Sequence, residues 1–111
     1  MKKFVVLNRN NDYRRIYARG RSFTGSVLVT YVMKNRRGVP RMGITTSKKV
    51  GKAVKRNRAR RLIREAYRMY APEIRGGYDL IFVARAKTPY VKCGQVAAQM
   101  KKHLEQAGVL K

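Results

Sequence analysis

Apolar residues recur at helical spacing in the middle of the chain, between residues 57 and 70. With successive side chains placed 100° apart, one face collects Ala59, Leu62, Ile63, Ala66, Tyr67 and Tyr70. The opposite face collects Arg60, Arg61, Arg64 and Arg68. Asn57 stands just before the first apolar position and is expected to cap the helix. The pattern predicts a helix that packs on a core and presents arginines outward, preceded by a loop over residues 48–55.

Two further stretches have a helical pattern. Residues 10–20 predict a short helix that one of the two asparagines at its start caps and that Gly20 ends. Residues 93–107 predict a last helix, with Gly108 as its stop. The buried face of that helix is expected to contain Cys93, Ala97, Met100 and Leu104.

Three stretches predict strands. Residues 21–34 and 41–47 are rich in β-branched and aromatic residues, and only a turn separates them, so they are expected to pair as an antiparallel hairpin. Residues 78–85 are strongly apolar, as expected of a strand near the centre of a sheet. The element order αββ(β)αβα predicts a single α+β domain over residues 1–111. Its one central, mostly antiparallel sheet would have helices packed on it.

The balance of charged residues narrows the range of possible binding partners. The 111 residues include 28 Lys or Arg against 5 Asp or Glu, which gives a formal net charge of +23. Because like charges repel and destabilise a compact fold, this excess indicates a nucleic acid or an anionic surface as partner. Hydrophobic residues make up 44% of the chain, which excludes a disordered basic tail.

Positive charge is most concentrated between residues 48 and 68, where the only acid is Glu65. A charged helix face is often merely solvated. Here, however, Arg60 and Arg64, and then Arg64 and Arg68, are like-charged pairs four residues apart, which destabilise a helix. A polyanion would relieve this repulsion, and the planar guanidinium group suits phosphates and base edges.

The first predicted helix allows two interpretations of its apolar face, which contains Tyr13, Ile16 and Tyr17. In one, all three side chains are core residues. In the other, the tyrosine rings stay partly exposed and stack on unpaired bases.

The chain lacks the motifs of several enzyme classes. It has no phosphate-binding glycine loop and no cluster of metal ligands, and its five acids are scattered. The single Cys93 is expected to act as a small apolar residue, and the single His103 to lie at the surface or half-buried. No apolar run approaches the roughly 20 residues that span a bilayer, so a cytoplasmic protein without a membrane partner is expected.

The run KKVGKAVKRNRARRLIREAYR at residues 48–68 resembles the signature of the bacterial ribonuclease P protein subunit, including its Arg-Asn-Arg core at residues 56–58. An NxDYxxIYxxG segment at residues 10–20, a hydrophobic strand with Tyr31 and the YDLIFVAR strand also stand where that family has them. The resemblance therefore covers nearly the whole chain.

This resemblance implies a cytoplasmic ribonucleoprotein endonuclease that removes the 5′ leader from precursor tRNA. In that family the RNA subunit is the catalyst and Mg²⁺ is held mainly by RNA. Neither a catalytic residue nor a metal bound by the protein alone is therefore expected. The family also has a left-handed βαβ crossover through the basic helix, whereas the general rule for such connections predicts a right-handed one.

The resemblance also implies two RNA-binding surfaces. The unpaired leader is expected in a cleft between the first helix and the sheet, at Tyr13, Tyr17, Val29 and Tyr31. The catalytic RNA subunit is expected to bind a basic loop and helix, at Lys48, Lys49, Lys52, Arg56, Asn57, Arg58, Arg60, Arg61, Arg64 and Arg68.

Three other functions fit part of the pattern. A ribosomal-type protein would bind RNA with the same charges but would have no role in cleavage. A DNA-compacting protein would be expected to have a dimer-forming apolar surface or a groove-reading element; neither is evident, so no DNA partner is expected. A self-sufficient protein nuclease would need candidate acids that the chain lacks.

Overall fold

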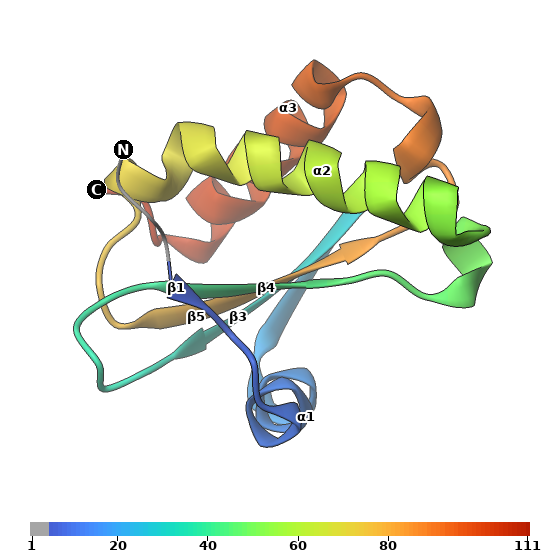
Figure 1. Ribbon diagram of the computed structural model, residues 1–111. Coiled ribbons are helices and arrows are strands. Elements are labelled where there is room, and N and C mark those ends of the chain that lie inside the picture. The colour runs from blue at the N-terminus through green and yellow to red at the C-terminus, as the bar shows by residue number, and fades with distance from the viewer. Residues whose placement is uncertain (1–4) are drawn as a thin grey trace.

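A computed structural model describes residues 5–111 as three α-helices on one five-stranded sheet, which confirms the α+β class (Figure 1). Residues 1–4 lie outside the described part. The strands are β1 (Val5–Val6), β2 (Arg21–Thr24), β3 (Leu28–Lys34), β4 (Arg41–Thr45) and β5 (Tyr78–Ala84). The helices are α1 (Asn10–Arg19), α2 (Ala53–Tyr70) and α3 (Cys93–Ala107), and the short 3-10 turns are η1 (Lys48–Val50), η2 (Ala71–Glu73) and η3 (Thr88–Tyr90).

The helices lie on opposite faces of the sheet. Figure 1 shows α2 and α3 on one face and α1 alone on the other. The larger core lies under α2 and α3, where Ile63, Tyr67 and Phe82 are fully buried. A smaller cluster under α1 is formed by Leu7, Ile16 and Ile81. Because one short helix cannot cover a whole sheet face, part of the α1 side stays open.

Strand β5 is central in the sheet order β1-β4-β5-β3-β2, as its apolar sequence predicts. It pairs antiparallel with β3 and parallel with β4, so the sheet is mixed. The predicted hairpin between residues 21–34 and 41–47 is therefore wrong, because β5 lies between these strands. Instead, residues 21–34 fold back on themselves at Gly25, whose N–H donates to Leu28 O at 2.8 Å, and form the hairpin β2–β3.

The connection from β4 through α2 to β5 joins two neighbouring parallel strands. In Figure 1 the chain runs rightward along β4, returns leftward through α2 above the sheet and enters β5 behind β4. This path is a left-handed crossover, as the family resemblance implies and contrary to the general rule.

Two predicted helix starts differ in the structure, and Gly20 ends α1 as predicted but in an extended conformation. Helix α2 begins one turn earlier than expected and has Lys52, not Asn57, at its cap position, because η1 and the bend at Gly51 (φ 133°) complete the loop sooner. Helix α1 is preceded by Arg9, so neither starting asparagine caps it. Gly20 has an extended backbone, and a Cβ there would lie 2.6 Å from Ile16 O, so close packing explains the glycine. Gly108 (φ 72°) ends α3 as predicted.

His103 is buried, so the expectation of a surface or half-buried side chain is wrong. Its Nδ1 lies 2.8 Å from the hydroxyl of Thr30, on the β3 face that α3 covers. Burial lowers the pKa of His103, and the charge of Lys102 lowers it further. Across residues 5–111, no helix has the length and apolar character needed to cross a bilayer.

A buried ion network connects α1 to the sheet. Arg41 in β4 donates from Nε and Nη2 to the two carboxylate oxygens of Asp79 in β5, at 2.8 and 2.7 Å. Asp12 of α1 lies 3.6 Å from Arg41 Nη1 and pairs with Arg15 at 2.9 Å. Asn35, in the β3–β4 turn, donates to Asp79 at 2.6 Å. Burial would raise the pKa of Asp79, but the hydrogen bonds from Arg41 and Asn35 outweigh it and hold that pKa below its ordinary value.

Replacing Arg41 tests this network. In Arg41→Met, Asp12 and Asp79 lose their shared buried partner, so we expect unfolding in urea at pH 7 to require about 3–5 kcal/mol less free energy. The Asp79 carboxylate stabilises the wild type above its unfolded pKa, and this contribution is lost as pH falls through the lower folded pKa. In the variant, burial raises the pKa of this carboxyl group, and protonation then relieves the unpaired charge. The stability difference should therefore shrink below about pH 5; a difference that is constant with pH would contradict this account.

Candidate nucleic-acid interface

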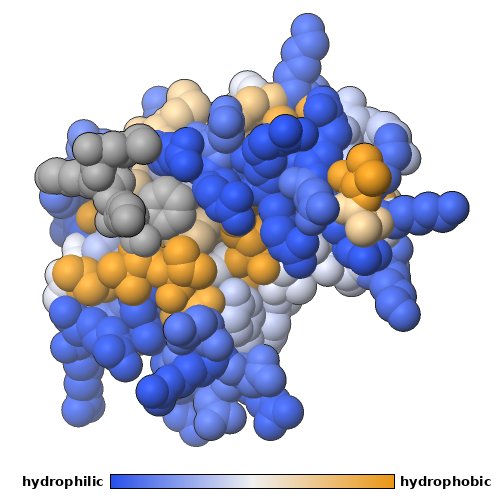
Figure 2. Space-filling model, in the orientation of Figure 1, coloured by the Kyte–Doolittle hydropathy of each residue, from blue (hydrophilic) through white to orange (hydrophobic). Residues whose placement is uncertain are grey.

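The first candidate surface is the outward face of η1 and α2. Hydrophilic side chains cover much of the surface over α2 in Figure 2. Within residues 5–111, none of the ten residues predicted to bind an RNA subunit pairs with a carboxylate, because every ion pair there involves Asp12 or Asp79. Arg56 and Arg60 are half-buried; the exposed members are Lys48, Lys49, Lys52, Asn57, Arg58, Arg61, Arg64 and Arg68.

Three arginines of this surface also make internal hydrogen bonds. Arg56 Nη1 donates to Gly51 O at 2.8 Å, and Arg58 Nε donates to Pro89 O at 2.7 Å. Arg60 Nη1 donates to the Asn57 side chain at 3.3 Å. Arg56 and Arg58 thus tie the loop before α2 and the η3 turn to the helix, whereas the Arg60 bond stays within α2. Arg61, Arg64 and Arg68 are exposed. A shallow hollow on this face is lined by Val54, Asn57, Arg58, Arg60, Arg61 and Arg64.

The second candidate surface is the part of the sheet that α1 leaves open. Strand β3 buries Leu28, Thr30 and Val32 on the α2–α3 side, whereas Val29 and Tyr31 on the other side stay half-exposed. They lie in an open groove of about 730 Å³. The groove is lined by Thr24, Ser26, Val29, Tyr31, Ser47, Lys49, Val83, Ala84, Arg85, Ala86 and Lys87.

The aromatic residues predicted for the leader cleft meet beside this groove. Tyr17 packs edge-on against Tyr31 with 4.8 Å between ring centroids, and its hydroxyl lies 2.6 Å from that of Thr45. Tyr17 is 38% exposed. Burial raises its pKa, although the hydrogen bond with Thr45 opposes this shift. Two partly exposed aromatic rings, Tyr31 in the floor of the groove and Tyr17 beside it, are suited to contact with unpaired bases.

Tyr13 has a different role from Tyr17. It is half-buried, its hydroxyl donates to Leu7 O at 3.4 Å, and its ring lies 6.4 Å from that of Tyr17. Burial is the main cause that raises the pKa of Tyr13. On the same helix, Ile16 is fully buried. Both sequence interpretations of this helix face are therefore partly right. Ile16 belongs to the core, Tyr17 is accessible, and Tyr13 is half-buried beside Tyr17.

Sequence reasoning missed several cations of the groove. Arg85 and Lys87 follow β5, and Lys49, which was grouped with the basic helix, also lines the groove. These residues lie far apart in the sequence and meet only because β4 and β5 are parallel neighbours that end at the same edge. Their only sequence signal is that Arg85 is the last residue of a predicted strand and that Lys49 and Lys87 closely follow one.

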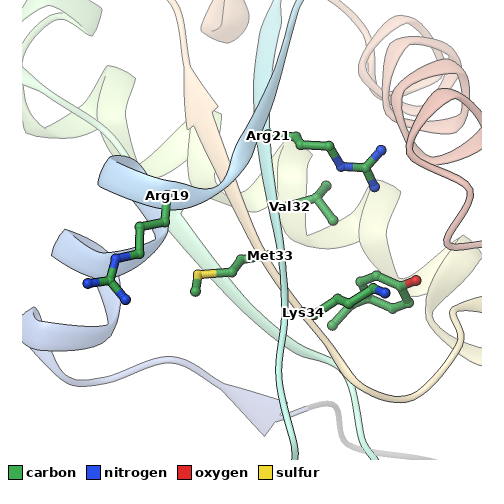
Figure 3. Close-up of a pocket in the computed structure, with 6 residues that line it drawn as sticks. Arg19, Arg21, Val32, Met33 and Lys34 are labelled. Carbon is green, nitrogen blue, oxygen red and sulfur yellow. The ribbon is translucent and has the colours of Figure 1, made fainter.

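A third hollow, of about 440 Å³, lies at the start of β2 and the end of β3. In Figure 3, Arg19 and Met33 lie on one side of β3, and Arg21 and Val32 lie on the other. Arg21 Nη2 donates to Ala107 O at 2.7 Å, so this arginine serves to hold the end of α3 against the β2 edge.

Comparison with known proteins identifies relatives over nearly the whole chain. A family model described as Ribonuclease P matches residues 1–108. A ribonuclease P protein component of Clostridium novyi is 42% identical over 111 residues, covering 98% of each chain. The solved ribonuclease P protein of Staphylococcus aureus has a TM-score of 0.85 and 32% identity over 98% of this chain and 100% of its own. That of Thermotoga maritima has a TM-score of 0.80 and 27% identity, covering 95% and 97%.

Replacing Gly43 tests whether the position of the Tyr13 ring depends on its close packing against β4. A Cβ at this position of β4 would collide with the hydroxyl and the ring of Tyr13. In Gly43→Ala we expect the Tyr13 ring to move toward water, so its raised pKa should fall back toward the ordinary value, at a cost of about 1–3 kcal/mol in stability. NMR titration of ¹³C-labelled tyrosine and a thermal melt measure the two effects.

Gly94→Ala is the matched control, because beyond the adjoining residues and backbone of its own helix nothing lies within 4 Å of the added methyl group. It should leave the Tyr13 pKa unchanged and stabilise α3 slightly, by up to about 1 kcal/mol. An unchanged Tyr13 pKa in Gly43→Ala would show that the burial of this ring does not depend on its contact with residue 43.

Proposed function

Because this chain belongs to the bacterial ribonuclease P protein family, which serves in tRNA processing, we propose that it binds two RNAs with two different surfaces. The outward face of η1 and α2 binds the catalytic RNA subunit. The groove beside α1 binds the 5′ leader of precursor tRNA. The assembled ribonucleoprotein is an endoribonuclease that cuts off the leader, and we expect it to act in the cytoplasm.

The α2 surface suits a folded RNA. Its exposed guanidinium groups have no carboxylate partners within residues 5–111, so they are available to phosphates. Each phosphate that they neutralise releases a condensed counterion, which makes such binding strong at low salt and weak at high salt. The repulsion between Arg64 and its neighbours one turn away is also relieved when phosphates lie between them.

The groove suits a single strand, and this observation carries the proposal. Its floor of Val29, Tyr31 and Val83 is apolar, and Tyr17 stands at its edge. Base–aromatic stacking contributes roughly 1–3 kcal/mol per base and accepts any sequence, as an enzyme that processes many precursors requires. Lys49, Arg85 and Lys87 can neutralise the leader phosphates. A base-paired strand would present its phosphates, not its base faces, to this floor.

We further propose that the protein supplies no catalytic group. The two acids that come together, Asp12 and Asp79, are engaged by Arg41. No group of three or more His, Cys, Asp or Glu residues within residues 5–111 could hold a metal ion. In this proposal the Mg²⁺ of the assembled enzyme is held mainly by RNA. The protein assists by holding the leader in a fixed position relative to the RNA subunit. The contact between substrate and catalyst then forms within one complex, which lowers its entropy cost.

A ribosomal-type RNA-binding protein is the alternative function. It would use the α2 surface in the same way, but it would have no need of an aromatic groove that accepts unpaired bases. The groove therefore favours the leader-binding function, and preference for precursor over mature tRNA separates the two.

The α2 surface is tested by charge removal at two exposed arginines. In the variant Arg61→Ala with Arg64→Ala, we expect weaker binding to the RNA subunit. The slope of log K against log salt should fall by about 1.4–1.8 in magnitude, because two phosphate contacts are lost. Lys101→Ala with Lys102→Ala removes the same charge from exposed positions of α3 and should change the slope little. Equal effects of the two double variants would mean that net charge alone drives binding.

The groove is tested by the ratio of affinities for precursor and mature tRNA. Tyr17→Ala with Tyr31→Ala should shrink this ratio in the assembled enzyme about tenfold or more, because two stacking surfaces are lost, while RNA-subunit binding changes little. Tyr17→Phe removes only the hydrogen bond with Thr45 and should keep the ratio. A thermal melt checks folding, since truncation of fully buried aromatic residues would cost about 3–5 kcal/mol. An unchanged ratio in a well-folded double variant would refute leader binding here.

A further inference from the structure

Tyr90 is the most exposed aromatic residue within residues 5–111. Its side chain is in η3, between β5 and α3, and the residue is 68% exposed. Tyr17, the next most exposed, is 38% exposed. A single exposed apolar side chain is common on protein surfaces and carries no information by itself. What distinguishes Tyr90 is how it is held and what surrounds it.

The segment that carries Tyr90 is firmly held. Thr88 and Pro89 are buried, and the Thr88 hydroxyl donates to Val27 O and accepts from Arg85 N–H, both at 2.7 Å. The N–H of Tyr90 donates to Lys87 O at 3.0 Å. The ring is therefore presented by a backbone that is already ordered, so a ligand that stacks on it has little backbone entropy to remove.

This segment is also attached to the basic helix. Arg58 Nε donates to Pro89 O at 2.7 Å, and the ammonium group of Lys55 lies 4.5 Å from the centroid of the Tyr90 ring. Next to Lys55, the side chain of Val54 is 78% exposed. The start of α2 thus combines cations with apolar surface that is mostly exposed.

A purely internal role for Tyr90 would be its cation–π contact with Lys55. An exposed contact of this kind is weak, and it needs neither a buried Thr88–Pro89 anchor nor a hydrogen bond from Arg58. A fixed aromatic ring with flanking cations matches what single-stranded nucleic acids require: a surface for a base and charges for its phosphates.

We propose that Tyr90 is a stacking platform for one unpaired base of the RNA subunit, with Lys55 placed to contact a phosphate beside that base. The inference rests on the proposed function, because the α2 surface must face the RNA subunit. It adds a base contact to a surface otherwise described by charge. The RNA segment involved is single-stranded, since a base inside a duplex cannot offer its face to a ring.

The test compares Tyr90→Ala, Tyr90→Phe and Lys55→Met in RNA-subunit binding across a salt series. Tyr90→Ala should weaken binding about 5- to 150-fold, the range that corresponds to the loss of one stacked base. The salt slope should stay at its wild-type value, because no cation is removed. Tyr90→Phe should bind like the wild type. Lys55→Met should lower the magnitude of the slope by nearly one.

A fluorescent variant gives an independent measurement. The chain contains no Trp, so Tyr90→Trp introduces a single reporter at this position. RNA-subunit binding should quench its emission through base stacking, whereas a leader oligonucleotide alone should not. Quenching by the leader but not by the RNA subunit would overturn the choice of partner.

The outcomes separate this inference from the proposed function. If the wild-type protein fails to bind the RNA subunit, the proposed function itself is wrong. If the wild type binds and a folded Tyr90→Ala binds equally well, only the platform is refuted. Loss of affinity in Tyr90→Phe as large as in Tyr90→Ala would mean that the hydroxyl group acts instead of the ring, and would also refute stacking. Circular dichroism and a thermal melt of each variant establish that it is folded.

Discussion

The arrangement of both proposed RNA-binding surfaces depends on the buried contact between Arg41 and Asp79. This pair joins β4 to β5, the two parallel strands on either side of the α2 crossover, and Asp12 extends it to α1. One network thus fixes the helix that carries Tyr13 and Tyr17 over the open part of the sheet. It also consumes two of the chain's five acids, so the exposed surface is left almost without negative charge.

Charged residues are therefore paired in the interior and largely unpaired on the surface. Inside, each cation of the network has a carboxylate, because an unpaired buried charge would be costly. Outside, the arginines of α2 are left unpaired and repel one another, a cost that a bound polyanion removes. The sheet separates the two surfaces: α2 and α3 cover one side, and α1 leaves a groove on the other. Lys49, in η1 after β4, belongs to the α2 surface and also lines the groove.

The sequence was most informative where the pattern is local. The apolar face of α2 follows from helical spacing, and its Ala59, Ile63 and Tyr67 are buried as predicted. The grouping of Tyr17 with Tyr31 also followed once the family resemblance assigned both to one cleft. Strand partners were wrong because pairing depends on which distant strand competes: β5, with apolar residues on both faces, displaced the short-range hairpin.

The remaining errors have the same cause. Asp12 and Asp79 look scattered in the sequence, yet a single buried arginine brings them together. The groove cations Arg85 and Lys87 lack any local motif. The buried state of His103 depends on Thr30 facing it from β3, a contact that no periodicity reveals. Long-range contacts between polar residues leave no regular spacing, so only the folded chain discloses them.

The central claim is that the η1–α2 surface and the groove beside α1 bind two different RNAs. Methyl and amide NMR with a short single strand tests this claim most directly. An unstructured oligonucleotide of about eight nucleotides should shift the signals of Val29, Tyr31 and Val83 and leave those of Arg61 and Arg64 nearly unchanged. A duplex of the same sequence should leave the groove signals unaffected. If the single strand instead shifts the α2 signals, or if the duplex shifts the groove signals equally, the separation of the two surfaces is contradicted.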